Sequence, residues 1–261
     1  MRHKLAVSLL GWAVLACNGD GRPSDRPAVR PSSAADSRPV VLFFGTSLTA
    51  GLGLEPEEAY PALIQAKLDS AGLAFRVVNA GVSGETSAAG LRRIDWLLTQ
   101  PVAVLVLELG ANDALRGQVL AAARRNLQAI IDRTRARHPD VRIVIAGMEA
   151  PPNLGRRYTA EFRQMFVDLA RRNEAALIPF LLEGVGGVPE LNQGDGIHPN
   201  AEGARIMAEN VWKVLEPVLR SSPPVPLSLR SSPPVPLSLR ERGNDVSVSS
   251  NRYERSVGFK T

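Results

Sequence analysis

The sequence has almost no cysteine, and its N-terminal apolar stretch is too short to cross a membrane. Cys17 is the only cysteine among 261 residues, so the chain can form no internal disulfide. The stretch LAVSLLGWAVLA has about a dozen residues, whereas a spanning helix needs about 20. These two shortages exclude a disulfide-stabilised scaffold and argue against a transmembrane helix at this point.

The N-terminus has instead the pattern of an export signal. A short basic start, MRHK, precedes the apolar stretch, which ends at Cys17. VLAC at that point resembles the lipobox of bacterial lipoproteins, in which the signal is cut before a cysteine that becomes lipidated. We therefore expect residues 1–17 to be a signal peptide, Cys17 to carry a lipid, and the protein to be exported to the bacterial cell envelope. It would be anchored in the membrane there and face the periplasm. The alternative is an ordinary secretory signal with Cys17 incidental.

A charge excess of one sign is also missing from the central part of the chain. The whole sequence has a net charge of +5. Residues 39–219, however, contain 18 Lys and Arg against 20 Asp and Glu, so the positive charge belongs to the two ends. A nucleic-acid-binding domain should have a basic face of its own, and we therefore expect no nucleic-acid partner.

The two flanking segments lack the periodicity of folded structure. Residues 18–38 are rich in Pro, Ser, Asp and Arg, a composition typical of a flexible linker. Residues 220–261 contain the decapeptide SSPPVPLSLR twice, at 221–230 and 231–240. Units this short and Pro-rich cannot stack as solenoid repeats. We predict a disordered tail, with a polyproline ligand at PPVP as the alternative.

Between these flanks, strand and helix patterns alternate through residues 39–219. Strands are expected at 39–44, 75–81, 102–110, 141–148 and 175–181, and helices at 57–72, 86–100, 117–139, 160–174 and 200–219. The strand at 102–110 is apolar almost throughout, as in a central strand covered on both faces. Five strands alternating with helices predict an α/β domain with a five-stranded parallel sheet and helices on both faces.

Polar, glycine-rich motifs follow the predicted strands. GTSLTAG follows the first strand, NAGVSGETS the second and LGAND the third, and DGIHPN precedes the last helix. In a parallel sheet, ligands bind beyond the carboxyl ends of the strands. We therefore expect the four motifs to meet at one edge of the sheet.

Ser47, in the first motif, is the side chain that this arrangement presents for chemistry. A serine is a poor nucleophile unless a base takes its proton. His3 lies in the predicted signal and His138 at the opposite end of the sheet, which leaves His198 as the base. Asp195, three residues earlier, could fold back onto the imidazole and fix its tautomer. Alternatively, Asp195 and His198 only cap a loop and the last helix.

Acyl transfer at Ser47 would also need hydrogen-bond donors for the developing oxyanion. Gly84 could provide a backbone N–H that a substrate can approach closely, and Asn112 could provide its side-chain amide. Both residue types are also common in turns. The convergence of five suitable residues at one sheet edge nevertheless favours a site.

The four motifs together resemble a known family. In order and spacing they are similar to the four blocks of the GDSL or SGNH hydrolases, and most similar to the small bacterial esterases with arylesterase, thioesterase and lysophospholipase activities. The resemblance extends over residues 39–219 and implies a flavodoxin-like three-layer αβα sandwich. One departure is Thr46, which stands where the family motif has Asp.

The resemblance also implies roles for individual residues. Ser47 would be the nucleophile, with His198 as its base and Asp195 orienting the imidazole. The oxyanion hole would consist of the N–H groups of Ser47 and Gly84 and the side-chain amide of Asn112.

The expected function is that of a serine esterase acting on simple carboxylic esters, thioesters or lysophospholipids through an acyl-enzyme. No metal or organic cofactor is expected, and we expect a monomer whose partners are the substrate and the membrane. Short connections should leave an open groove, lined by Met148, Pro151, Pro152 and Leu154, although these residues could simply form a rigid loop.

Three other functions stay open. A carbohydrate O-acetyl esterase of the same family would need a sugar platform, and the few aromatic residues near the motifs argue against one. A non-catalytic envelope binding lipoprotein would not need an intact nucleophile, base and donors. A metal-dependent phosphoesterase would need several converging histidine and carboxylate ligands, whereas only His198 is placed near Ser47.

Overall fold

The five predicted strands form one parallel sheet. The structure, a computed structural model, describes residues 36–221. The predictions for Cys17, the signal, most of the linker and the tail lie outside the described residues. The strands are β1 (Val40–Gly45), β2 (Arg76–Asn79), β3 (Val102–Glu108), β4 (Arg142–Ala146) and β5 (Ala176–Ile178). Their order is β2-β1-β3-β4-β5, with every neighbouring pair parallel. The predicted five-stranded parallel sheet is confirmed.

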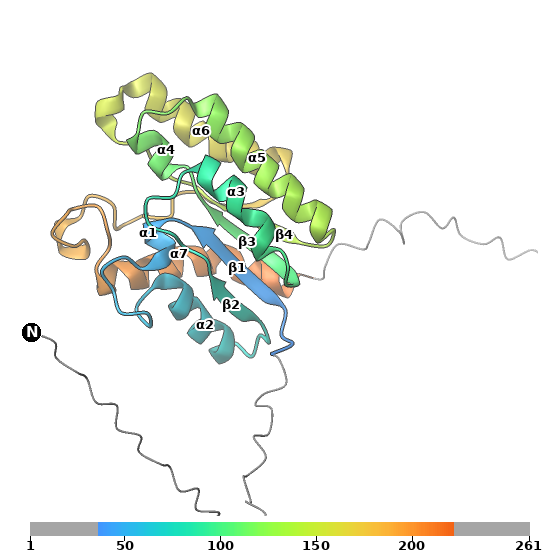
Figure 1. The fold of residues 1–261 in the computed structure, drawn as a ribbon. Helices are drawn as coiled ribbons and strands as arrows, with labels where there is room; N and C mark the ends of the chain where they lie inside the picture. Colours follow the sequence, from blue (N-terminus) through green and yellow to red (C-terminus); the bar gives the residue numbers. More distant parts are fainter. Residues whose placement is uncertain (1–35, 222–261) are drawn as a thin grey trace, which may run out of the picture. The chain divides into compact units, whose positions relative to one another are not determined.

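The helices cover both faces of this sheet (Figure 1). They are α1 (Ser47–Ala50), α2 (Tyr60–Ser70), α3 (Ser87–Leu97), α4 (Ala111–Leu115), α5 (Leu120–Arg137), α6 (Arg156–Arg172) and α7 (Ala201–Arg220), with short 3-10 turns at Pro152–Leu154 and Pro189–Leu191. Helices α3, α5 and α6 pack side by side on one face, and α2 packs with α7 on the other. The predicted three-layer sandwich is therefore confirmed. None of the described helices is both long and apolar enough to span a bilayer.

The centre of the core is formed by β1 and β3. All six residues of β1 are buried, and Leu42 lies in register with Leu105 of β3. Both leucines are 0% exposed, because helices cover the sheet on both sides. Burying a side chain of this size contributes about 1.5–3 kcal/mol. This rigid centre carries the loops that follow β1 and β3.

Helix α6 shows why the helical periodicity was informative. Phe162, Met165, Phe166 and Leu169 repeat at intervals of three and four and are all buried, which is the stripe that one helix face presents to a core. The helix starts at Arg156, four residues before the predicted start at 160. Arg156 and Arg157 are charged and exposed, and Tyr158 and Thr159 are only half-buried, so no buried apolar stripe marked this first turn.

Two short helices were not predicted. Helices α1 and α4 have four and five residues, too few to show a hydrophobic period. The helix predicted at 117–139 begins only at Leu120, as α5. Gly117, with φ +60°, is outside the helical conformation and separates α4 from α5. Thr86 caps α3: its Oγ1 accepts the N–H of Ala89 at 3.3 Å.

The strand order places a switch point between β1 and β3. From β1 the chain moves outward to β2, and then returns across β1 to continue with β3, β4 and β5 in the other direction. The loops that follow β1 and β3 therefore separate, and open α/β sheets bind their ligands in the crevice between such loops. Ser47 and Asn112 follow these two strands.

Candidate active site

Ser47 lies immediately beyond the end of β1. It is the first residue of α1, and it is half-buried. Gly51 ends the helix with φ 74° and ψ 44°, in the left-handed conformation that glycine adopts without steric cost. An N–H at the first position of a helix has no acceptor within the helix. Among residues 36–221, the Ser47 N–H donates to no other group either, so it stays available to a ligand.

Ser47, His198 and Asp195 form a hydrogen-bonded chain. The Ser47 Oγ lies 2.8 Å from His198 Nε2, and the Asp195 Oδ2 lies 2.6 Å from His198 Nδ1. The other carboxylate oxygen, Oδ1, accepts the N–H groups of His198 and Ile197. The backbone bond from His198, its side-chain bond and the bond from Ile197 together hold the pKa of Asp195 well below its usual value.

This geometry defines what the imidazole can do. A carboxylate only accepts hydrogen bonds, so the proton of the neutral ring lies on Nδ1, facing Asp195. Nε2 is then free to accept the proton of the Ser47 hydroxyl. Asp195 and His198 lie in one loop, and the structure brings both to Ser47, which precedes His198 by 151 residues.

Gln193 joins the His198 loop to the loop that follows α1. Its Nε2 donates to the carbonyl oxygens of Leu52 at 2.7 Å and Pro199 at 2.9 Å, and its N–H donates to His198 O at 2.7 Å. A Cβ at Gly53 would lie 2.2 Å from Gln193 Oε1, so only glycine allows this approach. Gln193 was missed because a single glutamine in a loop has no local signal.

Gly84 and Asn112 also lie close together. Gly84, with φ 77°, is the third residue of a turn closed by the bond from Glu85 N–H to Val82 O, and a turn of this kind favours glycine there. The Asn112 amide donates to Glu85 O at 3.1 Å, and Arg116 donates to Gly84 O at 2.9 Å. The Gly84 N–H and the second Asn112 amide hydrogen meet no acceptor among residues 36–221.

The turn that carries Gly84 lies beside α1. The Val82 N–H donates to Gly45 O at 3.0 Å, and a Cβ at Gly81 would lie 2.2 Å from Ala50 N. The predicted meeting of the loops after β1, β2 and β3 at one sheet edge is therefore observed. His138 lies between the end of α5 and the start of β4, at the opposite end of the sheet from Ser47, as predicted, and its Nε2 donates to Leu98 O at 3.2 Å.

Comparison with known proteins agrees with the resemblance to the GDSL or SGNH hydrolases. The model of the GDSL-like lipase/acylhydrolase family matches residues 5–206. The chain belongs to this family.

Two curated relatives and one solved structure are similar over most of the chain. Esterase TesA of Pseudomonas aeruginosa is 42% identical over 180 residues, covering 69% of this chain and 89% of the relative. "Thioesterase 1/protease 1/lysophospholipase L1" of Escherichia coli is 37% identical over 190 residues, covering 72% and 87%. A crystal structure of TesA superposes with a TM-score of 0.65 at 41% identity, covering 69% of this chain and 99% of that structure. The predicted family and fold class are confirmed.

In this GDSL-family chain, a buried carboxyl group lies behind the turn that carries Ser47. Glu108, the last residue of β3, is 0% exposed. It accepts the Thr46 N–H at 2.7 Å, the Thr46 hydroxyl at 3.0 Å and the Thr49 hydroxyl at 2.8 Å. The Tyr60 hydroxyl lies 2.8 Å from Thr49 Oγ1. Thr46, where the family motif has Asp, therefore bonds Glu108 through both its N–H and its hydroxyl.

Burial controls the protonation of this cluster. Removal from water raises the pKa of Glu108, and the hydrogen bonds from Thr46 and Thr49 oppose that rise. Burial, followed by the nearby charge of Glu108, raises the pKa of Tyr60. Glu108 was missed because its position in an apolar strand did not mark it as part of the site.

Two further buried carboxylates hold the loops around Gly84 and Asn112. Asp113 accepts the N–H of Ser87 at 2.7 Å and its hydroxyl at 2.6 Å, joining α4 to the start of α3. Glu85 forms an ion pair with Arg93. Among the residues that the structure describes, no three His, Cys, Asp or Glu side chains come together in a way that could hold a metal ion.

The predicted groove residues lie apart from the hollow that the structure shows beside Ser47. Met148 is only 5% exposed and packs in the core, so the structure corrects the expectation that its side chain lines an open groove. Pro151 and Leu154 are half-buried and Pro152 is exposed, and their role stays a prediction. The hollow, of about 10 Å³, is lined by Ser47, Leu48, Gly51, Leu52, Leu54, Tyr60, His198, Pro199, Ala204 and Met207.

Proposed function

We propose that this protein is a serine esterase that hydrolyses simple carboxylic esters, thioesters or lysophospholipids through an acyl-enzyme. The observation that carries the proposal is the hydrogen-bonded chain of Ser47, His198 and Asp195 at the carboxyl edge of the sheet. The relatives named as an esterase and as a thioesterase and lysophospholipase support this substrate class.

Acylation begins with proton transfer from Ser47 Oγ to His198 Nε2. The oxygen attacks the acyl carbonyl, and the imidazolium is stabilised by Asp195, which stays ionised because its pKa is depressed. The tetrahedral intermediate collapses when His198 donates its proton to the alcohol or thiol leaving group. The acyl group is then bonded to Ser47 Oγ.

The charge on the carbonyl oxygen needs donors during this step. The N–H groups of Ser47 and Gly84 and the free amide hydrogen of Asn112 are unpaired among residues 36–221 and belong to loops that meet at this edge. They are held in place before the substrate arrives, since Arg116 and Glu85 fix the Gly84 turn and the Asn112 amide. Donors that need no rearrangement stabilise an oxyanion most effectively.

Deacylation repeats the same steps with water as the nucleophile. His198 takes a proton from the water, which attacks the acyl carbon, and then returns the proton to Ser47 Oγ. The carboxylic acid leaves and the free enzyme is restored. Each proton has a defined donor and acceptor among Ser47, His198, water and the leaving group.

Covalent labelling tests the proposed nucleophile. A fluorophosphonate should add once to the full-length protein, at Ser47 by peptide mass, with a loss of activity on an aryl ester proportional to labelling. Ser47→Ala should take up no label. Labelling of another residue together with full loss of activity would contradict the mechanism.

A substrate panel separates the esterase proposal from its alternatives. Aryl esters, acyl thioesters, lysophospholipids and acetylated sugars of graded size are compared on the same protein sample. Turnover of the first three classes agrees with the proposal, and turnover of acetylated sugars alone would favour the carbohydrate O-acetyl esterase. A folded protein without activity on any of them would favour a binding lipoprotein.

We also propose that the protein is exported and anchored to the membrane by a lipid on Cys17. The support is the sequence of residues 1–17, which lie outside the described residues. Cys17→Ser should release the protein from the membrane fraction of a bacterial cell and leave its specific activity unchanged. Recovery of the unsubstituted protein in the soluble fraction would contradict the anchor.

A further inference from the structure

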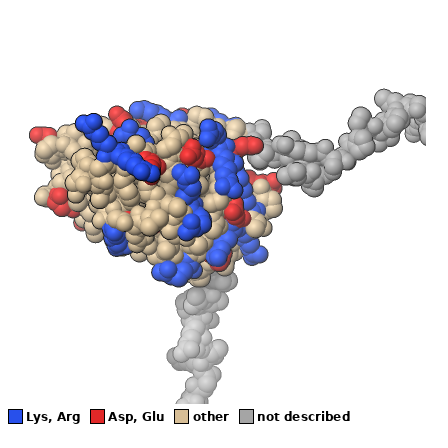
Figure 2. Space-filling view, turned by 90° about the horizontal axis from the view of Figure 1, so that it is seen from above, with Lys and Arg blue, Asp and Glu red and all other residues tan. Residues whose placement is uncertain are grey.

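Helices α5 and α6 form a basic face on a domain that is otherwise acidic. The two helices contain ten arginines, no lysine and three acidic residues. The rest of residues 39–219 contains eight Lys and Arg against 17 Asp and Glu. Figure 2, which looks down on the upper side of Figure 1, shows Lys and Arg gathered in rows there. The near-neutral total for the domain therefore conceals a strong separation of charge.

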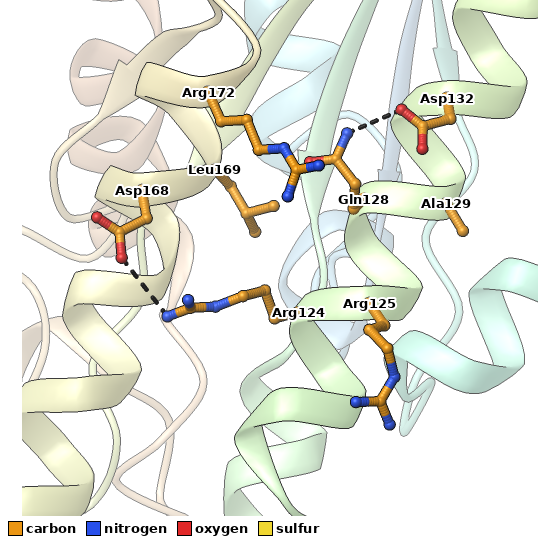
Figure 3. A pocket seen from close by; sticks show the side chains of 8 residues that line it. All are labelled: Arg124, Arg125, Gln128, Ala129, Asp132, Asp168, Leu169 and Arg172. Carbon is orange, nitrogen blue, oxygen red and sulfur yellow. Dashed lines mark hydrogen bonds and ion pairs between the residues drawn. The ribbon is translucent and has the colours of Figure 1, made fainter.

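A groove runs between these two helices (Figure 3). Its volume is about 310 Å³, and it is lined by Arg124, Arg125, Gln128, Ala129, Asp132, Asp168, Leu169 and Arg172. A second hollow of about 470 Å³ shares Arg124 and Arg125 and continues along α5 to Leu120 and Ala121. Arginine side chains thus border an extended hollow that contains alanine and leucine.

The groove has more positive charge than its own carboxylates neutralise. Arg124 pairs with Asp168 at 3.5 Å, and Asp132 accepts the side-chain amide of Gln128 at 2.8 Å. Arg125 and Arg172 have no ion-pair partner among residues 36–221. In Figure 3 the Arg172 side chain reaches from α6 toward α5, whereas Arg125 extends along α5. Two guanidinium groups therefore remain for an external anion.

The combination of arginine with exposed apolar side chains indicates that the external anion is the phosphate of a lipid bilayer. A guanidinium group binds phosphate through two parallel hydrogen bonds, and its alkyl stem can lie on apolar surface. Val119, directly before α5, is 71% exposed, and Val167 of α6 is 39% exposed. Basic residues combined with exposed apolar ones are typical of elements that lie on a membrane.

The same face lacks what single-stranded nucleic acid requires. Such ligands are held by aromatic side chains on which bases stack. The aromatic residues of α6 are Tyr158, Phe162 and Phe166, and α5 has none. Phe162 and Phe166 are buried, and Tyr158 stacks on Phe162. No ring on these helices is therefore fully exposed for a base.

We propose that the α5–α6 face binds the surface of an anionic phospholipid bilayer, with Arg125 and Arg172 contacting lipid phosphates and Arg124, which pairs with Asp168, adding positive charge beside them. This interaction is separate from the esterase proposal, because none of the three arginines belongs to the Ser47 site. It would hold the domain on the membrane in one orientation.

Vesicle binding by the full-length chain tests the proposal. Vesicles of phosphatidylcholine are compared with vesicles that also contain phosphatidylglycerol, and the partition coefficient is measured by co-sedimentation. One basic residue near an anionic surface changes that coefficient on the order of five-fold. The triple variant Arg124→Gln, Arg125→Gln, Arg172→Gln should lose on the order of 100-fold on the anionic vesicles.

A matched control keeps the change in net charge equal. Arg205→Gln, Lys213→Gln and Arg220→Gln remove three exposed positive charges from α7, on the opposite face of the sheet. The partition coefficient of this variant on anionic vesicles should fall by less than about five-fold, because its charges are distant from the bilayer and screened. Equal losses in both triple variants would show a general charge effect and overturn the proposal.

A dye on the face reports docking even if another segment of the chain also binds vesicles. In a Cys17→Ser chain, an environment-sensitive dye is attached at Ala121→Cys on α5 or at Lys213→Cys on α7, both exposed positions. The α5 dye should shift to shorter wavelength on anionic vesicles only, and the α7 dye should not shift. An α5 dye that does not respond would overturn the proposal.

Nucleic acid is the remaining competitor in this experiment. An oligonucleotide that abolishes the shift of the α5 dye at a lower concentration than soluble phosphatidylglycerol would identify a nucleic-acid surface, and the lipid proposal would be wrong. Hydrolysis of a soluble aryl ester is measured on the same samples, so a failure of the esterase proposal is recognised independently.

Discussion

The edge of the sheet around Ser47 and the face formed by α5 and α6 use polar groups in opposite ways. At the edge, Glu108 is fully buried, and each hydrogen bond that it accepts comes from a defined neighbour, Thr46 or Thr49. On the face, Arg125 and Arg172 have no ion-pair partner among the described residues. The proposed chemistry at the edge depends on the position of each atom, whereas the proposed lipid binding on the face depends on the number of positive charges.

This difference determines how each region should respond to substitution. A buried polar group that loses its partner costs about 1–3 kcal/mol, and a misplaced catalytic group costs orders of magnitude in rate. Exposed charges contribute at most about 1 kcal/mol each and are screened by salt. Single substitutions should therefore be severe at the edge and mild on the face.

The largest effect is expected at Ser47. Ser47→Ala removes the attacking oxygen and should lower turnover of an aryl ester on the order of 10⁶-fold, as for the serine of a comparable triad. Steady-state kinetics measures the loss, and circular dichroism checks that the protein is folded. Turnover within tenfold of the unsubstituted protein would remove Ser47 from the mechanism.

A smaller loss is expected at Asn112, where one donor is removed and others remain. Asn112→Ala should lower turnover by about 10²–10³-fold, with the Michaelis constant changed far less, because an oxyanion donor acts mainly in the transition state. Thermal unfolding is measured on the same sample.

The matched control for this change is Asn210→Ala. Asn210 also donates to backbone carbonyls, those of Leu181 and Glu183, but it lies on α7. The Asn210→Ala protein should be less stable, but its folded fraction should keep full turnover. A stable Asn112→Ala protein with full turnover would leave the oxyanion to Ser47 and Gly84.

The raised pKa of Glu108 should make the free energy of unfolding depend on pH. Its pKa is raised in the folded protein above the ordinary value of 4.5, so the unfolded chain releases this proton first as the pH rises. The stabilisation associated with the neutral carboxyl is complete below pH 4.5 and is lost as the pH approaches the folded-state pKa.

Glu108→Gln supplies the reference for this measurement, because it has no proton to lose. The free energy of unfolding of the unsubstituted protein, relative to Glu108→Gln, should fall above pH 4.5 by at most about 1.4 kcal/mol per pH unit. Denaturant unfolding at several pH values measures the difference. A difference that stays constant, or rises with pH, would contradict the raised pKa.

The smallest effect is expected from the arginines of the groove. The triple variant Arg124→Gln, Arg125→Gln, Arg172→Gln should keep turnover of a soluble aryl ester within about two-fold, because none of the three side chains belongs to the Ser47 site. The protein should also stay folded, since such surface substitutions usually change stability by less than about 0.5 kcal/mol each. Kinetics and thermal unfolding check this. A large loss of turnover would show that the two regions are coupled.

Much of the site could be predicted because its residues follow strands. Each strand is an apolar run, and a parallel sheet brings the ends of such runs together whatever their distance in sequence. His198 followed from the exclusion of His3 and His138, and the structure places it 2.8 Å from Ser47.

Other parts of the site and fold had no pattern from which to predict them. Glu108 lies in an apolar strand, so its apolar neighbours gave no sign of the carboxyl that binds the turn before Ser47. Gln193 is one loop residue whose partners are Leu52 and Pro199. Met148 is expected on an open groove because the connections are short, but packing from the neighbouring elements buries it.

By itself, the sequence determined which segments become strands and helices, since apolar spacing decides which side of each element avoids water. It also pointed to Ser47 and His198 as the candidate nucleophile and base, because few residues could have served. Only the tertiary structure decided which polar groups are buried, which arginines gather on one face and which donors remain unpaired. Those properties depend on contacts between segments far apart in the chain, and Glu108 and the α5–α6 groove exist only once the sheet and its covering helices have assembled.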